Sequence, residues 1–328
     1  CRTGTLPDAI GISLPPQPQP QQDAFGRTDT LGLRITGNLA PSELEHLVER
    51  DGRLALAESE LTALPPWTER YSDLITVAQL SGNRFVALPP RLRTFQDLER
   101  LDLTHNPITT LPQWLYDFDR LRFLDLTGNE LSELPGGISS MQSLACLMLY
   151  DNNLQGLPPD FSSLPCLEVA ILSANPFGEF PTQLLECSNL KRLDMASAGL
   201  GVLPESLSEM KGLRHLDVGG NELQQLPDGI FHGLQDLEYL ELTANRLRTL
   251  PESTGELHRL TIFLIGGNEL EEIPEAVWSL ARLRTLDLGR NPLKRLSPQV
   301  AQLAQLEELD LMGSAQLASL PSELADMP

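Results

Sequence analysis

Leucines recur along most of the chain in the pattern LxxLxLxxN. The pattern occupies residues 98–106, 121–129 and 144–152, so each copy begins 23 residues after the previous one. Further copies begin at Leu167, Leu190, Leu213, Leu237, Leu260, Leu283 and Leu306, and only the step from Leu213 to Leu237 is one residue longer. Tandem copies of one unit predict a repeat protein in which each unit packs against its neighbours.

The second half of each unit reads xLxxLP, as in residues 130–135. Proline lacks an amide hydrogen, so we expect it to end local pairing and to start the segment that returns to the next strand. After it, apolar residues such as Leu115 and Phe118 have the spacing of a single helical or 3₁₀ turn. Stacked units then place the LxL segments side by side as a parallel sheet, and the leucine columns form a continuous core.

An asparagine closes LxxLxLxxN in most units, in a column that runs from Asn83 to Asn291. We expect these side chains to be buried and to hydrogen-bond the backbone groups that the turns leave without partners, which is a structural and not a catalytic role. Ala198 and Ser314 replace the asparagine in two units, so the turn hydrogen bonds are expected to differ there.

The whole unit, LxxLxLxxNxLxxLPxxIxxLxx, resembles the leucine-rich repeat over about residues 51–328. It is similar to the 23-residue class found in Ras-suppressor and Scribble-type cytoplasmic scaffolds and in the repeat arrays of bacterial type III effectors. The resemblance implies an α/β solenoid, a horseshoe with a parallel concave sheet and short helical or 3₁₀ convex segments. It also implies that the chain recognises another protein.

The flanks of the array depart from the pattern. Residues 1–26 contain the Pro/Gln-rich stretch LPPQPQPQQ, which predicts an extended tether, with a Pro-rich ligand as the alternative. Residues 27–50 predict a degenerate first repeat with a helix capped by Ser42. The array of residues 51–328 shows no polar capping segment, so we expect it to be truncated at its C-terminus.

Composition narrows the possible partners. The 328 residues hold 24 Lys and Arg against 45 Asp and Glu, a net charge of −21, which argues against nucleic acid and favours a neutral or basic partner. Cys1, Cys146, Cys166 and Cys187 form no CxxC pair, so no structural zinc, and no other metal or cofactor, is expected.

The sequence carries no common catalytic motif. The five histidines fall in different units, and none of the motifs GxxxxGK[ST], GxGxxG, HExxH or GxSxG is present. We therefore expect no enzyme active site in this chain. The resemblance to effector arrays leaves open a catalytic domain fused outside it, such as a ubiquitin ligase.

The outward positions of the LxL strands hold the candidate binding residues. Aspartate usually occupies the position between the two leucines of LxL, and Met148 and Ile171 are apolar exceptions. The predicted patch is Phe123, Cys146, Met148, Tyr150, Val169 and Ile171, its charged rim is Arg100, Asp125, Arg192, Asp194 and His215, and a second apolar break includes Tyr239 and Leu264. An exposed apolar patch with a charged rim is typical of an interaction site, and a flanking domain or a second copy that covers it is the alternative.

The sequence thus predicts a protein-recognition domain that binds a partner, basic or with an apolar anchor, on the concave face. The resemblance suggests the target-selecting part of a larger bacterial effector-like protein, acting in the cytoplasm or secreted into a host cytosol. A non-enzymatic cytoplasmic signalling scaffold is one alternative. The other is a lipid-anchored bacterial surface protein, because the first residue, Cys1, is where a mature lipoprotein would begin, and only in that case is membrane contact expected.

Overall fold

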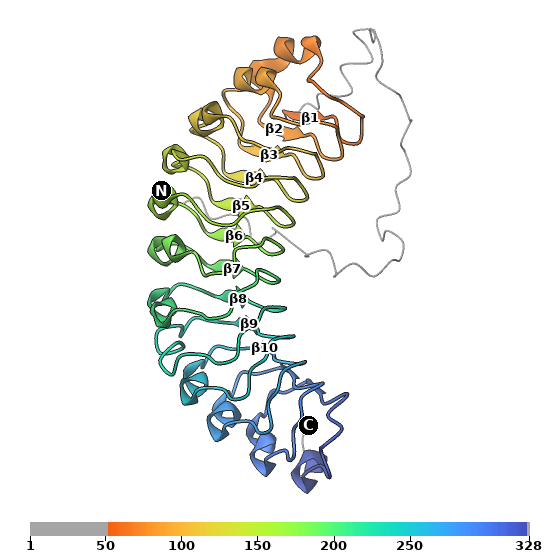
Figure 1. Cartoon of the computed structure of the whole chain (residues 1–328), viewed down its shortest axis with the longest axis vertical. Helices are drawn as coiled ribbons and strands as arrows, with labels where there is room; N and C mark the ends of the chain where they lie inside the picture. Colours follow the sequence, from red (N-terminus) through yellow and green to blue (C-terminus); the bar gives the residue numbers. More distant parts are fainter. Residues whose placement is uncertain (1–51, 327–328) are drawn as a thin grey trace.

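A computed structural model describes residues 52–326 of the chain. The tether, the degenerate first repeat and its capping helix, all expected within residues 1–50, lie outside the described residues. The described part is one curved stack of repeats with strands on one side and 3₁₀ helices along its outer, convex side (Figure 1).

The sheet has twelve strands in sequence order, and each strand is parallel to the next. The strands are β1 (Arg53–Ala55), β2 (Val77–Gln79), β3 (Arg100–Asp102), β4 (Phe123–Asp125), β5 (Cys146–Met148), β6 (Val169–Ile171), β7 (Arg192–Asp194), β8 (His215–Asp217), β9 (Tyr239–Glu241), β10 (Ile262–Leu264), β11 (Thr285–Asp287) and β12 (Glu308–Asp310). Equivalent repeat positions pair across neighbouring strands, for example Leu124 with Leu101 and Leu147, so the repeat period is also the register of the sheet. The predicted parallel sheet is confirmed.

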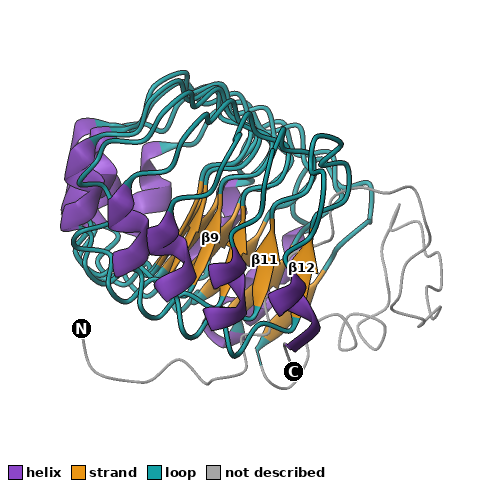
Figure 2. Cartoon of the chain, turned by 90° about the horizontal axis from the view of Figure 1, so that it is seen from below, coloured by secondary structure: helices purple, strands orange, loops and turns teal. Residues whose placement is uncertain are grey.

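Short 3₁₀ helices follow the LP motif on the far side of the strands (Figure 2). They are η1 (Pro66–Leu74), η2 (Pro90–Thr94), η3 (Gln113–Asp117), η4 (Ile138–Ser140), η5 (Pro159–Ser163), η6 (Thr182–Glu186), η7 (Glu205–Glu209), η8 (Glu252–Glu256), η9 (Glu275–Ser279), η10 (Pro298–Gln302) and η11 (Ser322–Asp326). The proline carbonyl starts the turn, as where Leu115 N donates to Pro112 O over 3.0 Å. The unit that is one residue longer forms turns between β8 and β9 instead of a 3₁₀ helix. Ile230 and Phe231, which lie in these turns, are buried in the core.

The leucine columns form a continuous apolar core, and the asparagine column is buried beside it. Asn152 represents the column: its Nδ2 donates to Leu126 O at 2.9 Å and Leu149 O at 3.1 Å, and its Oδ1 accepts from Leu131 N at 3.1 Å. Each amide therefore joins two repeats through backbone groups that would otherwise lack partners.

The two units without asparagine show how the turns adjust. Because Ala198 offers no side-chain oxygen, Phe177 N donates to the carbonyl of Asn175 at 2.9 Å instead of to a side chain of the next unit. Ser314 keeps a weaker link, from its Oγ to Leu288 O at 3.5 Å. The expected difference in turn hydrogen bonding is confirmed at these positions.

Candidate protein-binding face

In β1 to β11 the first and third residues of each strand point to the concave face, since the middle residue is buried in the core. This outward face divides into two regions. Strands β4 to β6 present mostly apolar side chains, and strands β7 to β9 present charged and aromatic ones. The predicted site residues are thereby placed on one continuous sheet, although they belong to different repeats.

The apolar region is less exposed than the sequence suggested. Phe123, Met148 and Val169 are half-buried and Tyr150 is 40% exposed. However, Cys146 is only 7% exposed and Ile171 only 3%, so the expectation that these two would be exposed is wrong. They lie in the middle of the region: Phe123 and Val169 flank Cys146 in register, and Met148 and Asp194 flank Ile171. The surface that a partner could touch here consists mainly of the other four side chains.

Arg100 and Asp125 border this region at β3 and β4. The Arg100 guanidinium lies over the Phe123 ring, 4.1 Å from its centroid, a cation–π contact that keeps the charge exposed. Asp125 is half-buried, and its Oδ1 accepts from Thr127 N at 3.0 Å. Burial raises the pKa of Asp125 above its ordinary value, although the bonds from Thr127 oppose that effect.

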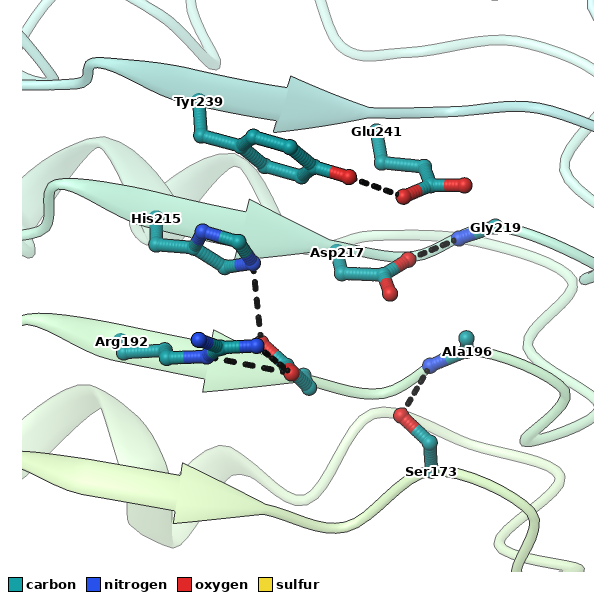
Figure 3. A network of polar contacts seen from close by, with 9 residues as sticks. Ser173, Arg192, Ala196, His215, Asp217, Gly219, Tyr239 and Glu241 are labelled. Atoms are coloured by element: carbon teal, nitrogen blue, oxygen red, sulfur yellow. Dashed lines mark hydrogen bonds and ion pairs between the residues drawn. The ribbon is translucent and has the colours of Figure 1, made fainter. Parts of the chain in front are cut away.

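Arg192, Asp194 and His215, three members of the predicted charged rim, form a cluster in which Asp194 is buried and the other two side chains are half-buried (Figure 3). Arg192 Nη2 lies 2.7 Å from Asp194 Oδ2, its Nε is 3.1 and 3.2 Å from the two carboxylate oxygens, and His215 Nε2 lies 3.3 Å from Oδ1. The Asp194 side chain is 3% exposed. Burial alone would raise its pKa, but contacts with His215 and Arg192 outweigh burial and hold the pKa below its usual range.

A second polar group lies beside this cluster on β8 and β9. The His215 and Tyr239 rings stack with centroids 4.0 Å apart, and the Tyr239 hydroxyl donates to Glu241 Oε2 (Figure 3). Thr243 Oγ1 donates to Glu241 Oε1 at 2.9 Å. Asp217 accepts only from Gly219 N, also at 2.9 Å, and burial followed by the charge of Glu241 raises the pKa of Asp217 to about 7.

Leu264 lies apart from both regions. It is half-buried on β10, where its in-register neighbours are Glu241 and Asp287. Four strand steps separate it from Ile171, so the second apolar break does not extend the apolar region of β4 to β6.

Three residues of this face were not among the sequence candidates: Ser173, Asp217 and Glu241. Ser173 Oγ accepts from Ala196 N at 2.9 Å, a bond that the aspartate of the same strand makes in other units, such as Asp217 to Gly219. The sequence shows Ser173 two residues after Ile171, but not its hydrogen-bond partner, which lies 23 residues away on the next repeat. Asp217 and Glu241 stand where most units carry an acidic residue between the two leucines of LxL, so nothing in the sequence distinguished them.

The described residues contain no group of three or more His, Cys, Asp or Glu side chains placed to hold a metal ion. Within the same part of the chain, no helix combines the length and the apolar character that crossing a membrane requires.

Comparison with known proteins points to one architecture. The family model described as "Leucine rich repeat" matches residues 76–131 and 211–270, and no curated protein sequence matches the chain. The Arabidopsis receptor kinase HAESA, solved in complex with the peptide hormone IDA and the co-receptor SERK1, is 28% identical, with 79% of this chain and 45% of that chain covered and a TM-score of 0.68.

Two bacterial structures share the fold. A Leptospira interrogans leucine-rich repeat protein is 25% identical, with 76% of this chain and 81% of that chain covered and a TM-score of 0.50. The functional domain of InlJ from Listeria monocytogenes is 20% identical, with 82% and 55% covered and a TM-score of 0.65. The chain thus spans about half the length of the HAESA and InlJ chains.

Proposed function

We propose that this chain, which is a leucine-rich repeat protein, is a protein-recognition domain that binds its partner on the concave sheet. The observation that carries the proposal is the row of half-buried apolar side chains on β4 to β6, beside the polar cluster of β7 to β9, on one open sheet face. Aromatic and Met side chains with an Arg at the edge are enriched at the centre of protein interfaces. The HAESA structure, a complex with a peptide hormone and a co-receptor, supports a protein or peptide partner.

We further propose that this recognition selects the target of a larger bacterial effector-like protein. The support is the resemblance of the repeat unit to bacterial effector arrays, together with the likeness to the Leptospira protein. A partner that comes from a host cell and not from the producing cell would favour this role. A partner from the producing cell's own cytoplasm would favour the scaffold alternative, and one on a neighbouring cell surface the lipid-anchored alternative.

The test of concave-face binding is Met148→Asp, which places a charge in the apolar region without removing a core residue. The immobilised chain is incubated with lysate, and captured proteins are identified and quantified by mass spectrometry. We expect the variant to capture the partner at least about tenfold less, because a buried charge at the centre of an interface is costly.

The matched control is Gln155→Asp, which adds the same charge in the same repeat, at an exposed position off the sheet. It is expected to capture the partner as the unmodified chain does, and circular dichroism melting checks that both variants fold. Equal capture by Met148→Asp and the unmodified chain would contradict binding on this face.

A further inference from the structure

Asp217 and Glu241 are neighbouring carboxylates that only neutral groups contact. The two residues are in register on β8 and β9, about 4.8 Å apart along the sheet. Their hydrogen bonds come from Gly219, Tyr239 and Thr243. Among residues 52–326, no Lys, Arg or His nitrogen lies within 4.0 Å of an oxygen of either carboxylate. Arg192 and His215 lie against Asp194 instead, and the charge of Arg192 only partly offsets the raised pKa of Asp217.

The Asp217 and Glu241 carboxylates lie side by side without an ion-pair partner among the described residues. Two half-buried carboxylates repel each other and lose part of their hydration, and the raised pKa of Asp217 reports that cost. A cation from outside would relieve both effects at once. The overall charge of −21 further favours the approach of a basic segment.

The path from this position to the apolar region is free of unpaired charge. Crossing from β8 to β5 passes Asp194, which is neutralised by its partners, and then Ile171, which is buried. Met148 follows on β5. Between three and four strand steps of about 4.8 Å separate Met148 from the midpoint of Asp217 and Glu241, a span of roughly 17 Å. An extended peptide covers that distance in about five residues, at about 3.3 Å per residue.

From this geometry we propose that the concave face binds a short extended segment of a partner protein that crosses the strands and carries a cationic and an apolar side chain about five residues apart. The cation, Arg or Lys, lies on Asp217 and Glu241, and the apolar side chain lies over Met148. This inference rests on the proposed function and specifies the chemistry of its partner.

The test begins with a random linear 12-residue peptide library displayed on phage and selected against the full chain. Enriched peptides are expected to carry Arg or Lys four to six residues from Leu, Ile, Met or Phe. Binding of synthetic peptides is then measured by fluorescence anisotropy. The double variant Asp217→Asn/Glu241→Gln is expected to bind them about 10- to 100-fold more weakly, and replacing the peptide cation by Gln to cause a similar loss that is not additive with it.

The control is Glu308→Gln/Asp310→Asn, which removes the same charge from the same sheet face on β12. It should weaken binding less than about threefold, so general electrostatic attraction is separated from a local contact, and thermal melting confirms the fold of each variant.

The outcomes separate this inference from the proposed function. The inference is overturned, and concave-face recognition left intact, by peptides that require Met148 for binding but carry no cation. Peptides whose affinity is unchanged by Asp217→Asn/Glu241→Gln have the same consequence. Peptides whose affinity changes neither with Met148→Asp nor with substitution of the two carboxylates contradict both this inference and the proposed function. Failure to enrich any peptide overturns the inference alone, because a partner that presents a folded surface could still be captured from lysate.

Discussion

Strands β7 and β8 carry an aspartate at the same position of the repeat, and the two carboxylates lie in opposite electrostatic environments. Asp194 is almost fully buried, paired with Arg192 and near His215, and its pKa is lowered. Asp217, its in-register neighbour, has no cationic partner, and its pKa is raised to about 7. Burial opposes ionisation at both sites, so the difference comes from the neighbouring charges.

The origin of the difference is a hydrogen bond made by a third residue. Asp217 keeps its carboxylate turned to Gly219 N, as Asp125 does to Thr127 N. In the unit of Asp194 the equivalent amide, Ala196 N, is taken by Ser173, and Asp194 turns to Arg192 instead. One repeat position can thus hold either a neutralised ion pair or an unpaired acid, depending on the strand beside it.

The largest expected effect comes from Arg192→Met, which would make Asp194 resemble Asp217. A buried carboxylate that loses its partner typically destabilises a protein by about 3 to 5 kcal/mol, and we expect about 2 to 3 kcal/mol here because His215 remains. Urea unfolding should show the full loss at pH 8 and a smaller loss at pH 5, because without Arg192 burial raises the pKa of Asp194 and the carboxylate can take up a proton.

Arg192→Met combined with Asp194→Asn is the control, since it leaves no carboxylate to be stranded. The double variant should recover most of the lost stability at pH 8. An Arg192→Met loss that is equal at both pH values would mean that packing, and not charge pairing, explains the role of Arg192.

A smaller effect of opposite sign is expected for Asp217→Asn. The folded chain binds a proton at Asp217 below pH 7, whereas an unfolded chain does so only near pH 4, so lowering the pH from 8 to 5 stabilises the fold through this group. The amide can still accept from Gly219 N but carries no charge. Urea unfolding should show about 2 kcal/mol more stability than the unmodified chain at pH 8 and a gain of less than about 1 kcal/mol at pH 5, which disappears only as the pH falls below the unfolded-state pKa near 4.

Some pH dependence of stability will remain in Asp217→Asn, because the pKa values of Asp125 and Asp287 are raised in the same direction. Asp310→Asn on β12 is the matched control and should change stability by less than about 0.5 kcal/mol. A destabilised Asp217→Asn at pH 8 would contradict the unpaired-acid interpretation.

The smallest expected effect is that of Ser173→Ala. Ala196 N would lose its acceptor, and Asp194 could rotate to accept from it at the expense of the contact with Arg192. We expect a loss of about 1 kcal/mol at pH 8, the usual contribution of one hydrogen bond. Nuclear magnetic resonance titration should also show the pKa of Asp194 moving upward; an unchanged pKa would show that Ser173 does not orient Asp194.

Sequence periodicity predicted the interior of this protein well. Leucine, asparagine and proline recur because each unit must meet the same stacking geometry, and the parallel register and the 3₁₀ turn after proline follow from it. Exposure on the concave face could not be predicted in the same way. Cys146 and Ile171 occupy outward positions between strands of other repeats, yet both are buried.

The tripeptide RLD shows where sequence reasoning ends. It forms both β3 and β7, but Arg100 on β3 lies over Phe123 while Arg192 on β7 binds Asp194. The period of the chain determined that both arginines point outward on the same sheet. Only the tertiary structure decided what each one contacts, because an outward side chain on a parallel strand meets side chains of adjacent strands, which lie a whole repeat away in the sequence.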